Sequence, residues 1–244
     1  MENLIIAAAQ TIPVKGDVDE NIKKHISLID QAHQKGVDLI VFPELSLTGY
    51  EPELARALAF TEKDERLNPL METAYEKQMI LVVGAPIQKN GKLHIGAFII
   101  YPNKSSAIYT KRYLHTGEDK FFDPGELDPQ IELKGETVSL AICADINNAS
   151  HPKKASSNGA NVYIAGVLWS TEGYKNDIKL MKDYATNYKM LVVLSNFGGD
   201  SGGYEAAGKS MIFSSNGEII SEIEGRGEGL AIARRENGNW FKII

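Results

Sequence analysis

Short runs of apolar residues alternate along this chain with longer segments whose apolar residues recur at the spacing of one helix face. The short runs are typical of buried strands, and the longer segments are typical of amphipathic helices. The chain opens with an apolar run at 4–11, a helical pattern at 18–36 that closes on a glycine, and a second apolar run at 37–44. This β-α-β opening predicts an α/β fold.

The alternation continues through the rest of the sequence. Further helices are predicted at 68–79, 151–159 and 174–189, and further strands at 80–87, 138–143, 160–166 and 190–196. Turn signals at 90–91 and 102–103, and an Asn-Gly turn inside the segment 210–223, indicate hairpins. Because hairpins join antiparallel strands, we expect mixed sheets. No linker, repeat or low-complexity tract interrupts the pattern, so residues 1–244 are predicted to form a single domain.

Composition excludes several classes of function. The formal net charge is −6, and the basic residues are scattered rather than gathered on one face, so nucleic acid is not expected as a partner. No apolar stretch approaches the roughly 20 residues that cross a bilayer, and the first residues lack the pattern of a secretory signal. With one cysteine, an internal disulfide is impossible. We therefore expect a cytoplasmic protein that binds neither nucleic acid nor membrane.

Three polar residues stand at the trailing ends of predicted strands. Glu44 follows "LIVFP", Lys111 follows "SSAIYT", and Cys143 follows "SLAI". Each alone has a simpler interpretation: a solvated acid, a surface base, and a buried thiol that fills the core. Because α/β proteins build their sites at strand ends, we expect the three side chains to meet.

A carboxylate, an ammonium and a thiol are the groups needed to cleave a carbon–nitrogen bond through a thioester. An ordinary thiol is largely protonated at neutral pH, so Glu44 is predicted to act as its base and later as the acid that protonates the leaving nitrogen. Lys111, with a backbone N–H near Ala144, is predicted to stabilise the oxyanion. This chemistry needs no cofactor. The five dispersed histidines and the lone cysteine predict no metal site.

These residues resemble the nitrilase superfamily of carbon–nitrogen hydrolases, in which Glu, Lys and Cys occur in this order. The matching segments are "VFPELSLTGYEP", "YTKRYLHTGEDKFFDPG" and "LAICADI", and the resemblance extends over essentially the whole chain. It implies a four-layer α-β-β-α sandwich, usually a homodimer, and a second catalytic glutamate at the place of Glu118. It also implies a small-molecule amide or carbamoyl amide as substrate.

The sequence departs from the family pattern near the predicted thiol. Tyr113 stands where family members often have a histidine, and the segment 146–157 lacks their usual aromatic-Pro-Glu element. Because these changes alter a wall of the pocket, the sequence does not specify a substrate. Tyr50 and Trp169 are predicted to be aromatic walls of the substrate site, although either could serve only in packing.

Four alternatives stay open at this point. The same catalytic groups serve nitrilases, so a small nitrile is an alternative substrate. A second alternative is a nitrilase-like protein that binds a ligand without catalysis. The isochorismatase-like amidases use Asp, Lys and Cys on a different sheet; Glu44 and the late hairpin disfavour them. Residues 203–210, "GYEAAGKS", fit a phosphate-binding loop, but a strand-turn-strand pattern follows where that loop needs a helix.

Overall fold

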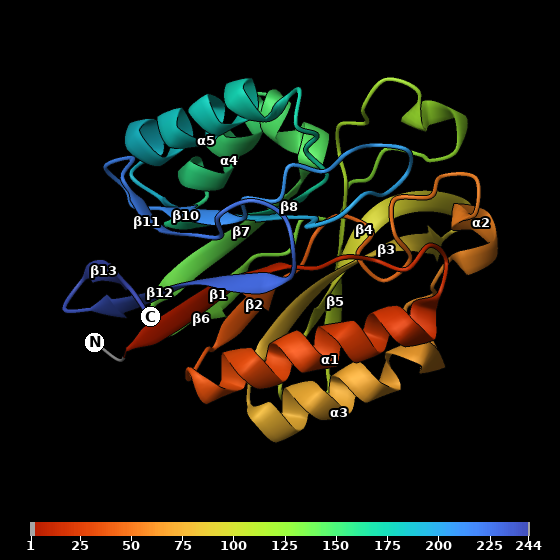
Figure 1. The fold of residues 1–244 in the computed structure, drawn as a ribbon, viewed down its shortest axis with the longest axis horizontal. Coiled ribbons are helices and arrows are strands. Elements are labelled where there is room, and N and C mark those ends of the chain that lie inside the picture. Colours follow the sequence, from red (N-terminus) through yellow and green to blue (C-terminus); the bar gives the residue numbers. More distant parts are fainter. Residues whose placement is uncertain (1–2, 244) are drawn as a thin grey trace.

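Two β-sheets lie face to face at the centre of the structure, a computed structural model that describes residues 3–243 (Figure 1). Within these residues the first sheet contains β1 (Leu4–Gln10), β2 (Leu39–Val41), β3 (Ile80–Lys89), β4 (Lys92–Ile100), β5 (Ser106–Thr110), β12 (Gly229–Glu236) and β13 (Asn239–Lys242). The second sheet contains β6 (Ile131–Leu133), β7 (Glu136–Ile142), β8 (Val162–Val167), β9 (Leu191–Asn196), β10 (Met211–Phe213) and β11 (Ile219–Glu222). The strand orders are β13-β12-β1-β2-β3-β4-β5 and β11-β10-β9-β8-β7-β6.

Helices cover the outer face of each sheet. The α-helices of the described residues are α1 (Val18–Gln34), α2 (Ala55–Leu58), α3 (Asn68–Lys77), α4 (Ser150–Ser157) and α5 (Tyr174–Tyr188). Figure 1 shows α1 and α3 against the first sheet and α4 and α5 against the second. The predicted α/β fold, with its four layers in the order α-β-β-α, is confirmed.

Apolar residues fill the three spaces between these layers. The core between the two sheets includes Ile6, Ile142 and Ile164, while separate clusters lie beneath α1 and α3 and beneath α4 and α5. Because strands of the central sheets are buried on both faces, they read in the sequence as continuous apolar runs. The helices bury one face each and therefore read as periodic patterns.

Both sheets are mixed, as the turn signals predicted. Strands β1, β2 and β3 run parallel, as do β7, β8 and β9, while antiparallel hairpins flank them. The run predicted at 37–44 forms a strand only over Leu39–Val41. Pro43 has no N–H to donate to a neighbouring strand, which accounts for the early end.

The C-terminal hairpin is the main element that the sequence analysis missed. β12 pairs with β1 and continues into β13, with Asn237 and Gly238 at the turn. The hairpin predicted at 210–223 is present as β10 and β11. Residues 203–210 lead into β10 rather than into a helix, so the structural context of a phosphate-binding loop is absent from this part of the described chain. No helix between residues 3 and 243 is long and apolar enough to cross a membrane.

Candidate active site

The ends of three strands bring four of the predicted residues into one place. Glu44 lies just beyond β2, Lys111 directly follows β5, and Cys143 directly follows β7. Glu118 begins a short 3-10 helix, Glu118–Lys120, on the loop after β5. Lys111 Nζ lies 2.7 Å from Glu44 Oε1 and 2.7 Å from Glu118 Oε1. We call these four residues the floor of the site.

The three charged side chains of the floor are almost completely removed from water. Their exposed fractions are 0% for Lys111, 1% for Glu44 and 3% for Glu118. Burial raises the pKa of Glu44 to about 7; Lys111 opposes this shift and Glu118 adds to it. Burial lowers the pKa of Lys111, but the neighbouring carboxylates outweigh it and hold the pKa above its ordinary value. The lysine is therefore an ammonium, and Glu44 can gain or lose a proton near neutral pH.

Cys143 is held in a backbone conformation that L-residues rarely adopt. Its φ is +43°, at the junction between β7 and the 3-10 helix Cys143–Asn147. Such strain is found mostly where the surrounding structure imposes it, often at functional sites. The thiol lies 3.9 Å from the carbonyl oxygen of Leu168. Burial, and next the charge of Glu44, raise its pKa, so the resting thiol keeps its proton.

Glu44 has one oxygen free to accept that proton. Oε1 accepts from Lys111, whereas Oε2 is buried and has no hydrogen-bond partner among the described residues. Cys143 lies close enough to affect the pKa of Glu44. Glu44 and Cys143 also line the same cavity.

Two glycines make room for the backbone that carries Glu44. A Cβ atom at Gly84 of β3 would clash with the carbonyl of Pro43 and the N–H of Leu45. A Cβ atom at Gly166 of β8 would clash with the carbonyl of Phe42. The loop of Glu44 therefore passes between one strand of each sheet, at a distance that only glycine allows.

Asp145 fastens the turn of Cys143 to the turn that follows Lys111. Its Oδ2 accepts from the backbone N–H of Ile142 at 2.9 Å, and its Oδ1 accepts from the N–H groups of Arg112 and Tyr113, each at 2.9 Å. Asp145 is itself fully buried. Because the carboxylate bonds to the last residue of β7 and to the turn that follows β5, it fixes the thiol relative to the ammonium.

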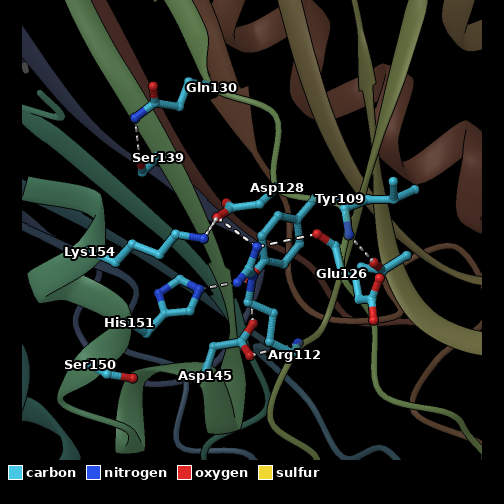
Figure 2. Close-up of polar contacts among 12 residues, drawn as sticks. Tyr109, Arg112, Glu126, Asp128, Gln130, Ser139, Asp145, Ser150, His151 and Lys154 are labelled. Carbon is cyan, nitrogen blue, oxygen red and sulfur yellow. Dashed lines mark hydrogen bonds and ion pairs between the residues drawn. The ribbon is translucent and has the colours of Figure 1, made fainter. Parts of the chain in front are cut away.

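A chain of buried side chains supports Asp145 from behind (Figure 2). Tyr109 donates its hydroxyl proton to Asp145 at 2.6 Å and lies 2.9 Å from His151 Nε2. His151 Nδ1 lies 2.8 Å from the hydroxyl of Tyr163. Since Tyr109 has one proton and gives it to Asp145, His151 must donate through Nε2 and accept from Tyr163 through Nδ1. The segment 146–157, which departs from the family pattern, thus supplies a histidine that orients the aspartate.

A cavity of about 230 Å³ opens above the floor. The predicted aromatic walls Tyr50 and Trp169 both line it, as do Glu44, Glu118 and Cys143. Ala144 is buried and does not line the cavity within the described residues. The sequence analysis missed further lining residues, among them His115, Asn147, Asp177 and Tyr204. We call His115, Trp169, Asp177 and Tyr204 the wall of the site.

Glu118 is oriented by two donors besides Lys111. The hydroxyl of Tyr50 donates to Oε1 at 2.8 Å, and the backbone N–H of His115 donates to Oε2 at 2.7 Å. Burial raises the pKa of Tyr50, and the two glutamates raise it further, so the hydroxyl remains a donor. Residues 3–243 contain no group of three or more His, Cys, Asp or Glu side chains placed to hold a metal ion.

Comparisons with known proteins find similarity along most of the chain. A family model described as carbon-nitrogen hydrolase matches residues 5–240. Glutamine-dependent NAD(+) synthetase of Thermotoga maritima is 28% identical over 230 residues, which cover 91% of this chain and 40% of that protein. 2-oxoglutaramate amidase of Bacillus subtilis is 29% identical over 224 residues, which cover 89% of this chain and 85% of the amidase.

The fold is shared with solved structures as well. The structure of an amidase from Nesterenkonia sp. AN1 superimposes with a TM-score of 0.85 at 25% identity, covering 94% of this chain and 91% of the amidase. This chain spans 40% of the length of the Thermotoga maritima synthetase, and the same share of a glutamine-dependent NAD(+) synthetase of Aquifex aeolicus, which is 26% identical over 230 residues.

Proposed function

The chain belongs to the carbon–nitrogen hydrolase family of the nitrilase superfamily, and from this premise we propose that it hydrolyses a small amide through a thioester on Cys143. The observation that carries the proposal is the meeting of Glu44, Glu118 and Cys143 at one cavity, with the Lys111 ammonium bonded to both glutamates. A volume of about 230 Å³ favours a substrate of a few heavy atoms.

In the first half-reaction, Glu44 removes the proton of Cys143 as Sγ bonds to the amide carbon. The unpartnered Oε2 of Glu44 supports this role, because it is an acceptor that nothing else uses. The carbonyl oxygen becomes an oxyanion, which the Lys111 ammonium stabilises. Glu44 then gives its proton to the nitrogen, the carbon–nitrogen bond breaks, and ammonia or an amine leaves behind a thioester.

In the second half-reaction, Glu44 removes a proton from a water molecule that attacks the thioester carbon. Glu118, held by Tyr50, Lys111 and the N–H of His115, helps to position that water. The carbon–sulfur bond breaks, the acid is released, and the proton on Glu44 returns to Sγ. A base with a pKa near 7 suits both proton transfers.

Two of the relatives compared are amidases, which supports an amide as substrate. A further relative, of Pyrococcus abyssi, is named a nitrilase, so a small nitrile stays the alternative substrate. The synthetase relatives support a second candidate, hydrolysis of the side-chain amide of glutamine, because these enzymes are glutamine-dependent. The homodimer that the family resemblance implies stays a prediction, which sedimentation equilibrium would test.

An ammonia-release screen over small primary amides, carbamoyl amines, glutamine and nitriles tests the proposal. We expect release from at least one amide, and none from Cys143→Ala, whose circular dichroism and melting temperature should match the wild type. Mass spectrometry of a quenched reaction should show the acyl group on the wild-type protein alone. Release by Cys143→Ala at the wild-type rate would rule out the thioester, and turnover of nitriles alone would favour a nitrilase.

A further inference from the structure

One carboxylate in the cavity is not part of the floor. Asp177 lies in the first turn of α5 and lines the same cavity as Cys143. Its side chain is half-buried, and within residues 3–243 it makes no hydrogen bond or ion pair. Burial raises the pKa of Asp177, while His115 acts in the opposite direction. A partly desolvated carboxylate without a partner is costly unless a ligand supplies one.

The charge of Asp177 is not balanced by a lysine or an arginine among the residues that line the cavity. Lys111 contacts Glu44 and Glu118 from beneath, so the floor already contains its own cation. Among the residues that line the cavity, none is a lysine or an arginine, and the sole histidine is His115. Carboxylates on one side of a cleft focus a negative potential into it. An anionic group at the far end of a substrate, away from the floor, would meet no lysine or arginine among these lining residues.

We propose that the cavity selects small amides whose far end carries a cationic group, an ammonium above all, and that Asp177 receives this group. The inference rests on the proposed amide hydrolysis and names its substrate class. The ammonium gains an ion pair in a partly desolvated place, whereas the carboxylate of an anionic amide is repelled by Asp177 and by the floor. Asp177 thus acts on specificity and not on the bond that is cleaved.

A series of amides that differ mainly in charge tests this assignment. The probes are butanamide, 4-aminobutanamide and succinamate, with 3-aminopropanamide and 5-aminopentanamide to vary the reach of the ammonium. For the wild type we expect kcat/KM to favour the best amino amide over butanamide by about tenfold or more, and succinamate to be the poorest substrate. In Asp177→Asn the ratio of amino amide to butanamide should fall to about one.

Asp183→Asn is the matched control, because Asp183 is an exposed aspartate of the same helix that does not line the cavity. It should keep both the wild-type rate and the wild-type ratio. A second readout is binding of the same amides to Cys143→Ala, measured by calorimetry. There too the amino amide should bind more tightly than butanamide, and the added Asp177→Asn change should remove the difference.

The two readouts separate failure of the inference from failure of the proposed function. Hydrolysis of the neutral or anionic amides without preference for the amino amides, or a preference that survives in Asp177→Asn, would overturn the role of Asp177 and leave the hydrolase intact. If the wild type releases no ammonia from any amide while Cys143→Ala still binds the amino amide through Asp177, the proposed function fails and the cation site stands.

Discussion

The floor and the wall of the cavity are held in place by different means. Lys111, Glu44 and Glu118 are almost fully buried, and Lys111 bonds to both glutamates. Lys111 and Glu44 follow strands, and Glu118 begins a short 3-10 helix. The wall comes from loops and from the first turn of α5, and Asp177 and Tyr204 are far more exposed. The contrast teaches that the reaction is fixed by the core of the fold, while the choice of amide is left to segments that can change without disturbing that core.

The largest effect should come from removing the base of the floor. Glu44→Gln keeps the shape of the side chain but cannot accept the thiol proton, so we expect kcat/KM to fall by about a thousandfold or more. Glu53→Gln, at an exposed position on the same loop, should change it by less than about twofold. Steady-state kinetics on one amide would check both. Activity within tenfold of wild type in Glu44→Gln would show that the floor lacks its assigned base.

The next largest effect should come from substituting Lys111, with Lys209 as the comparison. Lys111→Ala removes the cation of the oxyanion, which should cost about 10²–10³ in kcat. It also leaves Glu44 and Glu118 buried without their partner, which should lower the free energy of unfolding by about 3–5 kcal/mol. Lys209 is exposed, with Nζ 5.0 Å from the centre of the Tyr174 ring, and Lys209→Ala should lower kcat less than threefold.

Denaturant titration and kinetics of both variants would check the comparison. ATP with magnesium should not raise the melting temperature of the wild type, because residues 203–210 lead into a strand. An ATP-dependent shift that disappears in Lys209→Ala would restore the nucleotide-binding interpretation.

The dependence of kcat/KM on pH should reflect the ionisation of Glu44 and Lys111 in the floor, and not that of the wall. Glu44 works as a base in its ionised form, and its pKa is raised to about 7. Activity should therefore be lost as pH falls through 7, with kcat/KM at about pH 5 roughly a hundredfold below the plateau. The pKa of Lys111 is raised, so its titration should not reduce activity on the alkaline side up to about pH 9. With butanamide as substrate and circular dichroism to monitor folding, a flat profile below pH 7 would contradict Glu44 as the base.

The smallest effect should come from the support behind Asp145. Tyr109→Phe removes one of four hydrogen bonds to this carboxylate and leaves His151 without an acceptor. We expect kcat to fall about three- to tenfold with KM nearly unchanged, and alkylation of Cys143 by iodoacetamide to change in rate. Tyr101→Phe, a half-buried tyrosine outside this chain of bonds, is the control. A change in KM with kcat unchanged would contradict this role, because it would show that the substitution alters substrate binding by the wall and not the position of the thiol.

The sequence predicted the floor better than the wall for a physical reason. Glu44, Lys111 and Cys143 each follow an apolar run, so a local pattern marks each of them as a residue at a strand end, where α/β proteins build their sites. That the ends of β2 and β5 meet the end of β7 depends on the packing of the two sheets face to face. Asp177 and Tyr204 belong to segments whose path depends on contacts far away in the sequence, so no local pattern marks them. The hairpin at Asn237 and Gly238 did carry a local signal, and β12 and β13 could have been found from it.

Other features could not have been found in this way. The positive φ of Cys143 and the chain from Tyr163 through His151 to Asp145 arise only from packing between elements. The segment 146–157 lacks the aromatic-Pro-Glu element of the family pattern, yet its His151 bonds to Tyr109 and so contributes to holding the turn of the thiol.

Asp145 also couples hydrogen exchange at the end of β7 to hydrogen exchange in the turn after β5. The N–H groups of Ile142, Arg112 and Tyr113 all donate to its one carboxylate, although Ile142 is the last residue of β7 and the other two lie in the turn after β5. None of these amides can exchange with deuterated solvent while the carboxylate stays in place, and breaking any one bond loosens the others. We therefore expect the turns that carry the thiol and the ammonium to open together in hydrogen exchange, as one cooperative unit.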